Sequence, residues 1–185
     1  MSDTREQLID LAEQAIAERG YASFSFRELA SEMGIKSASV HYHFPTKTDL
    51  GLAVTERYLD RFTQALALID ERNPSPAGRV RAYVQMYREE AESSERMTIC
   101  IMLSAERAVL PDAMCAHLAR FYRLNLDWLC GVVAQTGVRA DSTKARNRAS
   151  QVLALLQGAL LSAKTLNEMA MFDAATLAIE PLVFR

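Results

Sequence analysis

Apolar residues recur along this chain with the period of an α-helix, and polar residues fill the positions between them. The first such segment begins at Thr4, which has capping-box spacing with Gln7, and ends at Gly20. Its apolar face consists of Leu8, Leu11, Ala12, Ala15 and Ile16. Glycine and proline are scarce, and the alternating β-branched runs typical of strands are absent. The pattern therefore predicts an all-α protein.

The same periodicity predicts eight further helices. They cover residues 25–34, 37–44, 47–72, 77–94, 98–109, 112–135, 142–167 and 174–184. Residues 73–78 have the proline, serine and glycine content of a linker, while Pro111 and Gly137 mark later breaks. We expect two domains: a helix-turn-helix over residues 1–46 and a helical bundle over residues 47–185.

Residues 24–50 carry the most specific local signals. Ser25 and Glu28 have the spacing of a capping box, and Gly34 stands where a chain leaves a helix with positive φ. A second short helix follows, for which Ser37 is the expected cap, and Thr46 with Asp49 form another box. Two short helices across a tight turn are typical of a helix-turn-helix that places its second helix in the major groove of DNA.

These residues resemble the helix-turn-helix signature of the TetR family of bacterial transcriptional regulators. The matching positions are Ser25, Arg27, Leu29, Ala30, Gly34, Ile35, Val40, Tyr42, His43, Phe44, Lys47 and Leu50. The resemblance covers roughly the first 50 residues and implies a DNA-binding regulator with a small-molecule site in its C-terminal half. His41 stands where the family usually has tyrosine, which makes a phosphate contact there sensitive to pH.

We expect double-stranded DNA to contact two groups of residues. Base edges and methyl groups are within the expected reach of Arg27, Lys36, Ser37, Ala38, Ser39 and Tyr42. Phosphates are expected to contact Ser25, His41, His43, Thr46 and Lys47. The first group sets sequence preference, and the second sets affinity and register.

Charge argues against DNA binding by a general electrostatic mechanism. The net charge is −2, and acidic residues outnumber basic ones within residues 1–50. Affinity must then come from a few placed cations and from two copies of the helix-turn-helix on a palindromic operator. The alternative is a helical ligand-binding or redox- and electrophile-sensing interaction module with little DNA binding.

Residues 152–166 are apolar around most of the helix circumference, which requires more cover than one small bundle offers. A homodimer would supply that cover, with the C-terminal segment completing a four-helix contact. The expected interface residues are Leu153, Leu156, Gly158, Leu160, Ala163, Leu177 and Phe184. A central helix of a monomer is the alternative.

A cavity between the predicted helices 77–94, 98–109 and 112–135 is the expected effector site. Its candidate lining is Tyr83, Met86, Tyr87, Cys100, Leu103, Arg107, Cys115, Phe121, Tyr122 and Trp128. Most of these positions also suit an ordinary core, because methionine and aromatic residues at helical spacing usually pack. Effector binding is expected to shift the helix at 47–72, which changes the separation of the two DNA-binding heads so that both no longer fit the grooves and a repressor is released.

Other classes of protein fit the sequence poorly. Cys115 and His117 are two residues apart on a helix, so they face different sides and do not pair for catalysis. We therefore expect no enzyme activity and no cofactor. We also expect no metal, because the paired Cys/His spacings of structural zinc sites are lacking. Three cysteines suggest reduced, buried thiols, with a redox sensor as the alternative. No secretion signal or membrane span is predicted, which favours the cytoplasm.

Overall fold

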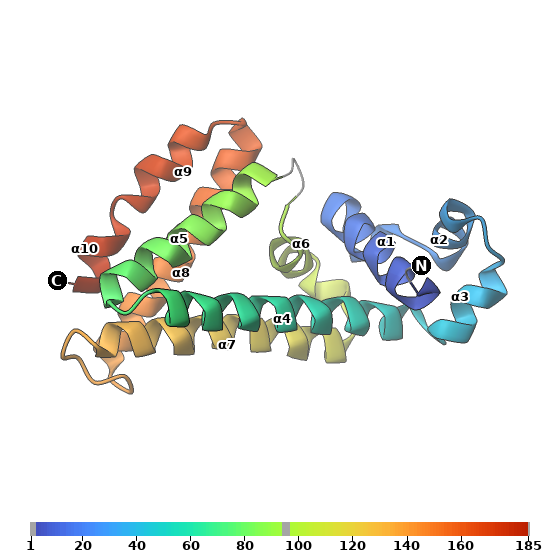
Figure 1. Cartoon of the computed structure of the whole chain (residues 1–185). Helices are drawn as coiled ribbons and strands as arrows, with labels where there is room; N and C mark the ends of the chain where they lie inside the picture. Colours follow the sequence, from blue (N-terminus) through green and yellow to red (C-terminus); the bar gives the residue numbers. More distant parts are fainter. Residues whose placement is uncertain (1–2, 94–96, 185) are drawn as a thin grey trace. The chain divides into compact units, whose positions relative to one another are not determined.

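The computed structural model describes residues 3–93 and 97–184, and every regular element within them is helical (Figure 1). The elements are α1 (Thr4–Arg19), η1 (Tyr21–Ser23), α2 (Phe26–Met33), α3 (Ser37–His43), α4 (Lys47–Arg72), α5 (Pro76–Ser93), α6 (Ile99–Ala105), η2 (Arg107–Val109), α7 (Asp112–Ala134), α8 (Thr143–Leu166), α9 (Met169–Thr176) and α10 (Ile179–Phe184). The predicted all-α class is confirmed. The predicted end of the fifth helix at Ser94 lies outside the described residues.

Several helix boundaries differ from the prediction, and the predicted last helix is two helices, α9 and α10. The N-cap of α1 is Asp3, whose side chain accepts from the backbone N–H of Arg5 at 3.3 Å, so Thr4 is the first helical residue. The predicted helix 98–109 becomes α6 followed by the 3₁₀ turn η2. The last segment is helical already from Met169, because Asn167 adopts a left-handed conformation (φ 53°) and turns the chain directly after α8.

The chain forms two compact units, and α4 and α7 contribute residues to both. Among the described residues, unit 1 contains 3–61 and 97–121, and unit 2 contains 62–93 and 122–184. The predicted domain boundary between residues 46 and 47 divides a DNA-binding part from a ligand-binding and dimerisation part. The two units seen here are instead defined by which residues pack together. The functional division stays a prediction.

Unit 1 is built around α1, which packs on η1, α2 and α6. Its buried side chains include Leu8, Ile16, Leu29, Val40, Leu50, Leu103 and Met114. Apolar positions predicted for α1 are thus part of a core that also takes residues from α6 and α7. The helix-turn-helix therefore folds together with a later part of the chain.

Unit 2 is built around α8, which packs against α5, α9 and α10. Its buried side chains include Val80, Tyr83, Leu129, Leu156, Leu160, Phe172 and Ile179. Charged side chains join these helices at the surface: Arg88 of α5 bonds Asp173 of α9 at 2.8 Å, and Arg81 bonds Glu180 of α10 at 2.8 Å. The C-terminal helices are thus anchored on α5 as well as on α8.

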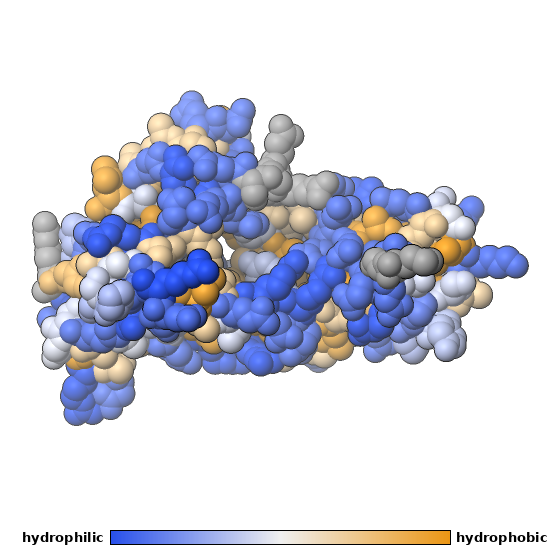
Figure 2. Space-filling view, in the orientation of Figure 1, coloured by the Kyte–Doolittle hydropathy of each residue, from blue (hydrophilic) through white to orange (hydrophobic). Residues whose placement is uncertain are grey.

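Figure 2 shows a face on which hydrophilic residues predominate and hydrophobic residues form separate patches. Among the described residues, no helix combines the length and the apolar character needed to cross a bilayer.

Candidate nucleic-acid interface

The turn between α2 and α3 is fixed by the local sequence. The Ser25 hydroxyl accepts from the Glu28 backbone N–H at 3.3 Å, and the Glu28 carboxylate accepts from the Ser25 N–H at 2.7 Å. The Ser25 hydroxyl also donates to the Glu28 carboxylate at 3.0 Å, and this bond, followed by the one from the Ser25 N–H, lowers the pKa of Glu28. Gly34 is left-handed (φ 67°) and Ile35 donates to the Ala30 carbonyl at 2.9 Å, which closes the helix end. The predicted capping box and glycine stop are confirmed.

Helix α3 has one inward and one outward face, as predicted. Val40 and, just after the helix, Phe44 are buried, whereas the Tyr42 side chain is 85% exposed. The expected cap is corrected: Ser37 is the first helical residue, and Lys36 occupies the N-cap without a side-chain hydrogen bond. The side chain of Lys36 is thus left to solvent at the start of α3.

The outward side of the helix-turn-helix presents most of the residues expected to contact bases. Arg27, Lys36, Ser37, Ala38 and Tyr42 are exposed, and Ser39 is half-buried. Within the part of the chain that the structure describes, the side chains of Arg27 and Lys36 form no ion pair or hydrogen bond. These cations are available to an anionic partner.

A hollow of about 410 Å³ adjoins α3. It is lined by Thr4, Ile35, Ala38, Ser39, Tyr42 and His43. Thr4 was not among the residues predicted to contact DNA, although it opens α1, whose N-terminal amides carry partial positive charge. The position of Thr4 beside α3 depends on the tertiary fold, and its capping spacing alone does not show it.

Three residues expected to contact phosphate already have partners within the chain. The Ser25 hydroxyl bonds Glu28, and the Thr46 hydroxyl donates to the Asp49 carboxylate at 2.7 Å. Lys47 donates from Nζ to the carbonyl of Phe24 at 2.6 Å. These side chains shape the helix ends, and their contacts with phosphate stay predictions.

The His41 ring is held in one tautomer by the backbone. Its Nδ1 lies 3.3 Å from the carbonyl oxygen of Pro45, and its ring meets Phe26 edge to face at 4.9 Å. A carbonyl oxygen only accepts, so Nδ1 carries the proton, and Nε2 of a neutral ring has a lone pair and cannot donate. Only the protonated imidazole can donate from Nε2 to a phosphate.

This geometry predicts that a phosphate contact from His41 depends on its ring nitrogen Nε2. A hydrogen bond to a charged group contributes about 1.5 kcal/mol or more, so His41→Phe should lower operator affinity about tenfold in fluorescence anisotropy. The phenylalanine ring should keep the edge-to-face contact with Phe26. An unchanged affinity of His41→Phe would contradict the assignment.

Arg57 of α4 holds α1 in place through its guanidinium group. It bonds Asp10 at 2.7 Å, Glu6 at 3.5 Å and Glu13. Burial opposes the charge of Arg57, but hydrogen bonds from these carboxylates raise its pKa overall. Arg61 also pairs with Glu13. Periodicity alone did not reveal this contact, although the acidic stripe at positions 6, 10 and 13 is visible in the sequence.

The structure corrects part of the expected dimer interface. Leu153, Leu156, Leu160 and Ala163 are buried by the chain's own helices, so they are unavailable to a partner. Gly158, Leu177 and Phe184 are exposed, as the prediction requires. A helix that is apolar around most of its circumference has two faces to cover, and sequence alone does not say which one the protomer buries.

The residues expected to line an effector cavity divide between the units. In unit 2, the Tyr83 ring lies 5.1 Å from that of Tyr87 and 5.0 Å from that of Trp128. In unit 1, Cys100 and Phe121 both contact Tyr58. Met86 and Tyr122 are half-buried, Leu103 is buried and Arg107 is exposed. A common cavity stays a prediction.

A buried polar cluster in unit 2 was not predicted. Tyr83 and Tyr87 both donate to Oδ1 of Asn125, at 2.5 and 3.1 Å, and Asn125 is fully buried. Trp128, which packs on Tyr83, donates to Asp70 at 3.0 Å. A buried amide between two phenols sets the side-chain orientations of α5 and α7 within this unit.

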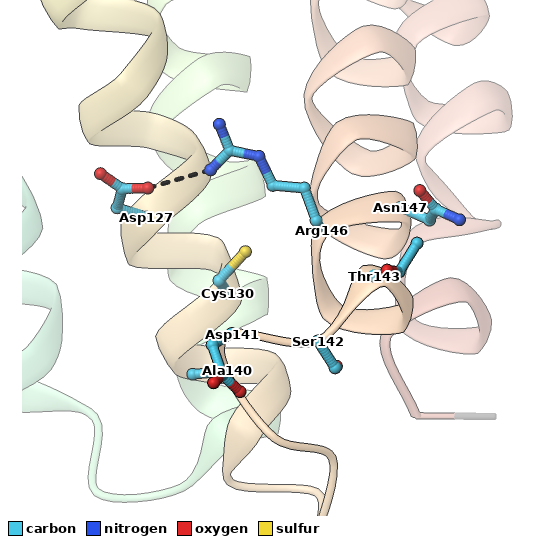
Figure 3. A pocket seen from close by; sticks show the side chains of 8 residues that line it. All are labelled: Asp127, Cys130, Ala140, Asp141, Ser142, Thr143, Arg146 and Asn147. Atoms are coloured by element: carbon cyan, nitrogen blue, oxygen red, sulfur yellow. Dashed lines mark hydrogen bonds and ion pairs between the residues drawn. The ribbon is translucent and has the colours of Figure 1, made fainter.

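Unit 2 also contains a polar hollow of about 410 Å³ between the end of α7 and the start of α8 (Figure 3). Its wall includes Asp127 and Arg146, which bond at 3.0 Å, and the buried Cys130. Burial raises the pKa of the Cys130 thiol. That direction is opposite to the activation that a redox-sensing cysteine requires.

Cys115 is also arranged differently from a reactive cysteine. Its sulfur donates to the carbonyl oxygens of Arg107 and Leu110, at 3.7 and 3.8 Å. In the described part of the chain the Arg107 guanidinium makes no contact with this sulfur, so the cation that would activate the thiol is not bonded to it. The redox alternative thus has little support at this position.

Comparisons with known proteins agree with this geometry. Residues 8–54 match the family model described as bacterial regulatory proteins, tetR family. The uncharacterized HTH-type transcriptional regulator YerO of Bacillus subtilis is 30% identical over 71 residues, 38% of this chain and 25% of that protein. The HTH-type transcriptional repressor NemR of Escherichia coli K12 is 28% identical over 115 residues, 60% of this chain and 58% of that protein. The chain thus spans less than two thirds of either curated relative.

The structural comparison extends the similarity to the whole chain. The crystal structure of a TetR transcriptional regulator from Legionella pneumophila superposes with a TM-score of 0.89 and 28% identity. It covers 98% of this chain and 97% of that one. The similarity therefore includes the C-terminal helices as well as the helix-turn-helix.

Proposed function

This chain belongs to the TetR family of DNA-binding transcriptional regulators, and we propose that it is a repressor that binds a palindromic operator as a homodimer. A small-molecule effector releases it from the operator. The observation that carries this proposal is α3, which buries Val40 and exposes Tyr42, while Lys36 at its N-cap has an exposed side chain without an ion pair among the described residues. The family consists of regulators and not of enzymes.

The homodimer proposal now rests on the outer face of α8. Ala154, Gly158, Leu161 and Thr165 are exposed at spacings of four, three and four, so they lie along one stripe of the helix. A side chain added at Gly158 would meet nothing within 4 Å in its own protomer, which leaves room for a second helix to approach closely. Leu177 and Phe184 of the C-terminal segment are also exposed apolar side chains.

The effector proposal is supported by the aromatic and polar composition of unit 2. Tyr83, Tyr87 and Asn125 present hydrogen-bonding groups inside an otherwise apolar layer, which is the composition of small-molecule sites. Native mass spectrometry of the purified protein should detect a bound compound or accept one from a library. Tyr87→Phe should weaken that binding if the cluster contacts the effector.

In vitro selection from random duplexes tests the function directly. We expect enriched sequences to be inverted repeats, bound as one dimer per duplex in a gel shift with mass determination. A promoter carrying the selected site should be repressed in a reporter strain that makes the protein. Enrichment of single half-sites would contradict the palindromic dimer, and increased reporter expression would show an activator.

Tyr42 is expected to determine base preference. Tyr42→Ala should remove a base or methyl contact, which contributes about 1–3 kcal/mol, and affinity for the selected operator should fall about tenfold or more. Affinity for unrelated duplexes should change little. Tyr42→Phe keeps the ring and separates the contribution of the hydroxyl. If Tyr42→Ala weakens all duplexes equally, the side chain contacts the phosphate backbone and its assigned role is wrong.

A further inference from the structure

The turn that joins α1 to α2 is held by a carboxylate from far along the chain. Glu106, at the end of α6, accepts hydrogen bonds from the backbone N–H of Tyr21 and, at 3.1 Å, from that of Ala22. These N–H groups open the 3₁₀ turn η1, where the first donors lack an acceptor within the helix. One side chain thus satisfies two adjacent backbone donors 84 and 85 residues away.

Gly20 makes this contact possible. A side chain at Gly20 would place its Cβ 2.6 Å from the carboxylate atoms of Glu106, closer than real contacts allow. Gly20 also has φ 84° and ψ 166°, a backbone conformation that is essentially confined to glycine. Glycine is therefore the residue that allows both the backbone conformation of the turn and the close approach of the Glu106 carboxylate.

Lys47 holds the opposite side of the same turn. Its Nζ donates to the carbonyls of Ala22 at 3.3 Å and Phe24 at 2.6 Å. It lies 4.8 and 4.4 Å from the ring centroids of Tyr21 and Phe24. Burial lowers the pKa of Lys47, and the negative charge of Glu106 partly opposes that effect. Ala22 is thus bonded through its N–H to an anion and through its C=O to a cation.

The side chain of Tyr21 ties the turn to the two long helices α4 and α7. Tyr21 is buried beside Gly51 of α4. If Gly51 had a side chain, its Cβ would lie only 2.9 Å from the Tyr21 ring. The Met114 sulfur of α7 would lie 2.7 Å from the same Cβ. The absence of a side chain at Gly51 lets Tyr21 and Met114 fill that space. The turn consequently contacts α4, α6 and α7 within unit 1 and leads through Ser25 directly into α2.

We propose that Glu106 is a positioning residue that couples the α6–η2 segment to the helix-turn-helix. The proposal rests on the DNA-binding function and specifies how it is regulated. A shift of the end of α6 withdraws one carboxylate from both amides together, and it also removes the charge that faces Lys47. The Gly20–Phe24 turn then loses the contacts that orient α2 and α3. A ligand that favours a displaced α6 therefore lowers DNA affinity, and DNA favours the α6 position seen here.

The reciprocal effect allows a test without the effector. Hydrogen exchange followed by mass spectrometry is measured on the full-length protein, free and bound to the selected operator duplex. In the wild type, DNA should slow exchange in α3, in the 20–24 turn and in residues 99–109. Glu106→Ala should lose the protection of residues 99–109 while α3 remains protected at saturating DNA. Its operator affinity should fall about tenfold, since a smaller fraction of molecules is binding-competent.

Two variants separate positioning from general damage. Glu106→Gln keeps an acceptor oxygen, so it should recover part of the affinity and part of the DNA-linked protection. Glu71→Ala removes an exposed carboxylate of α4 and should match the wild type in both measurements. Equal affinity and equal protection of residues 99–109 in wild type and Glu106→Ala would overturn the coupling alone. A wild type that binds no duplex would contradict the DNA-binding function and the coupling with it.

Discussion

Leu161→Asp should convert the protein to a monomer and weaken its binding to a palindromic operator by at least about a hundredfold, because the second head loses its tether. The Leu161 side chain is 45% exposed in the protomer and lies on the stripe with Gly158, so an aspartate there stays solvated until a partner covers it. Burying that charge without a counter-ion is too costly for the interface. Sedimentation equilibrium and operator titration measure the two effects.

The chain offers a matched control for this substitution. Leu68 is a leucine of similar exposure, 40%, on a different helix, α4, and Leu68→Asp should remain dimeric with wild-type affinity. Circular dichroism should show both variants equally helical. If Leu161→Asp remains a dimer at micromolar concentration, the outer face of α8 is not the interface. A monomer with undiminished operator affinity would instead contradict the two-head model of binding.

Gly20→Ala should destabilise unit 1 by about 3 kcal/mol, which combines a strained backbone conformation with displacement of a carboxylate from two amides. The backbone at Gly20 has φ 84°, and the new Cβ would lie 2.6 Å from the Glu106 carboxylate. Urea unfolding, followed by circular dichroism, should show the loss as a lower midpoint. The Gly20–Phe24 turn should exchange its amide hydrogens faster.

A double-mutant cycle divides that loss between its two causes. Adding Glu106→Ala to Gly20→Ala removes the clash, so the two losses should sum to more than the double variant shows. Gly131→Ala is the control, because Gly131 lies within α7 and a Cβ there meets nothing within 4 Å. That substitution should stabilise the protein by about 0.5–1 kcal/mol. A neutral Gly20→Ala would show that the turn relaxes freely.

Features of the helix-turn-helix that depend on neighbouring residues followed from the sequence. Ser25 with Glu28 and Thr46 with Asp49 each interact across three residues, so their geometry needs no tertiary fold. Gly34 ends α2 for the same local reason. The inward position of Val40 also follows, because a four-residue spacing to Phe44 defines a helix face.

Features that depend on contacts between residues far apart in the chain could not be predicted from the sequence. The burial of Leu156 and the exposure of Leu161 reflect which side of α8 packs on α5, α9 and α10, and both are leucines in the sequence. The role of Glu106 did not follow either, because its backbone partners are 84 and 85 residues away. The start of α9 was missed because an asparagine, Asn167, adopts the left-handed turn usually given to glycine.

The acidic stripe of α1 bears on how the protein searches a genome. Glu6, Asp10 and Glu13 are bonded to Arg57 and Arg61, while Arg27 and Lys36 remain unpaired among the described residues. The cations are thus kept at the proposed DNA-contact face, and the acids that lower the net charge are neutralised along another helix. Because the whole chain is slightly anionic, random DNA attracts it weakly. A smaller fraction of molecules is then held at the many competing sites, which raises operator occupancy at a given copy number.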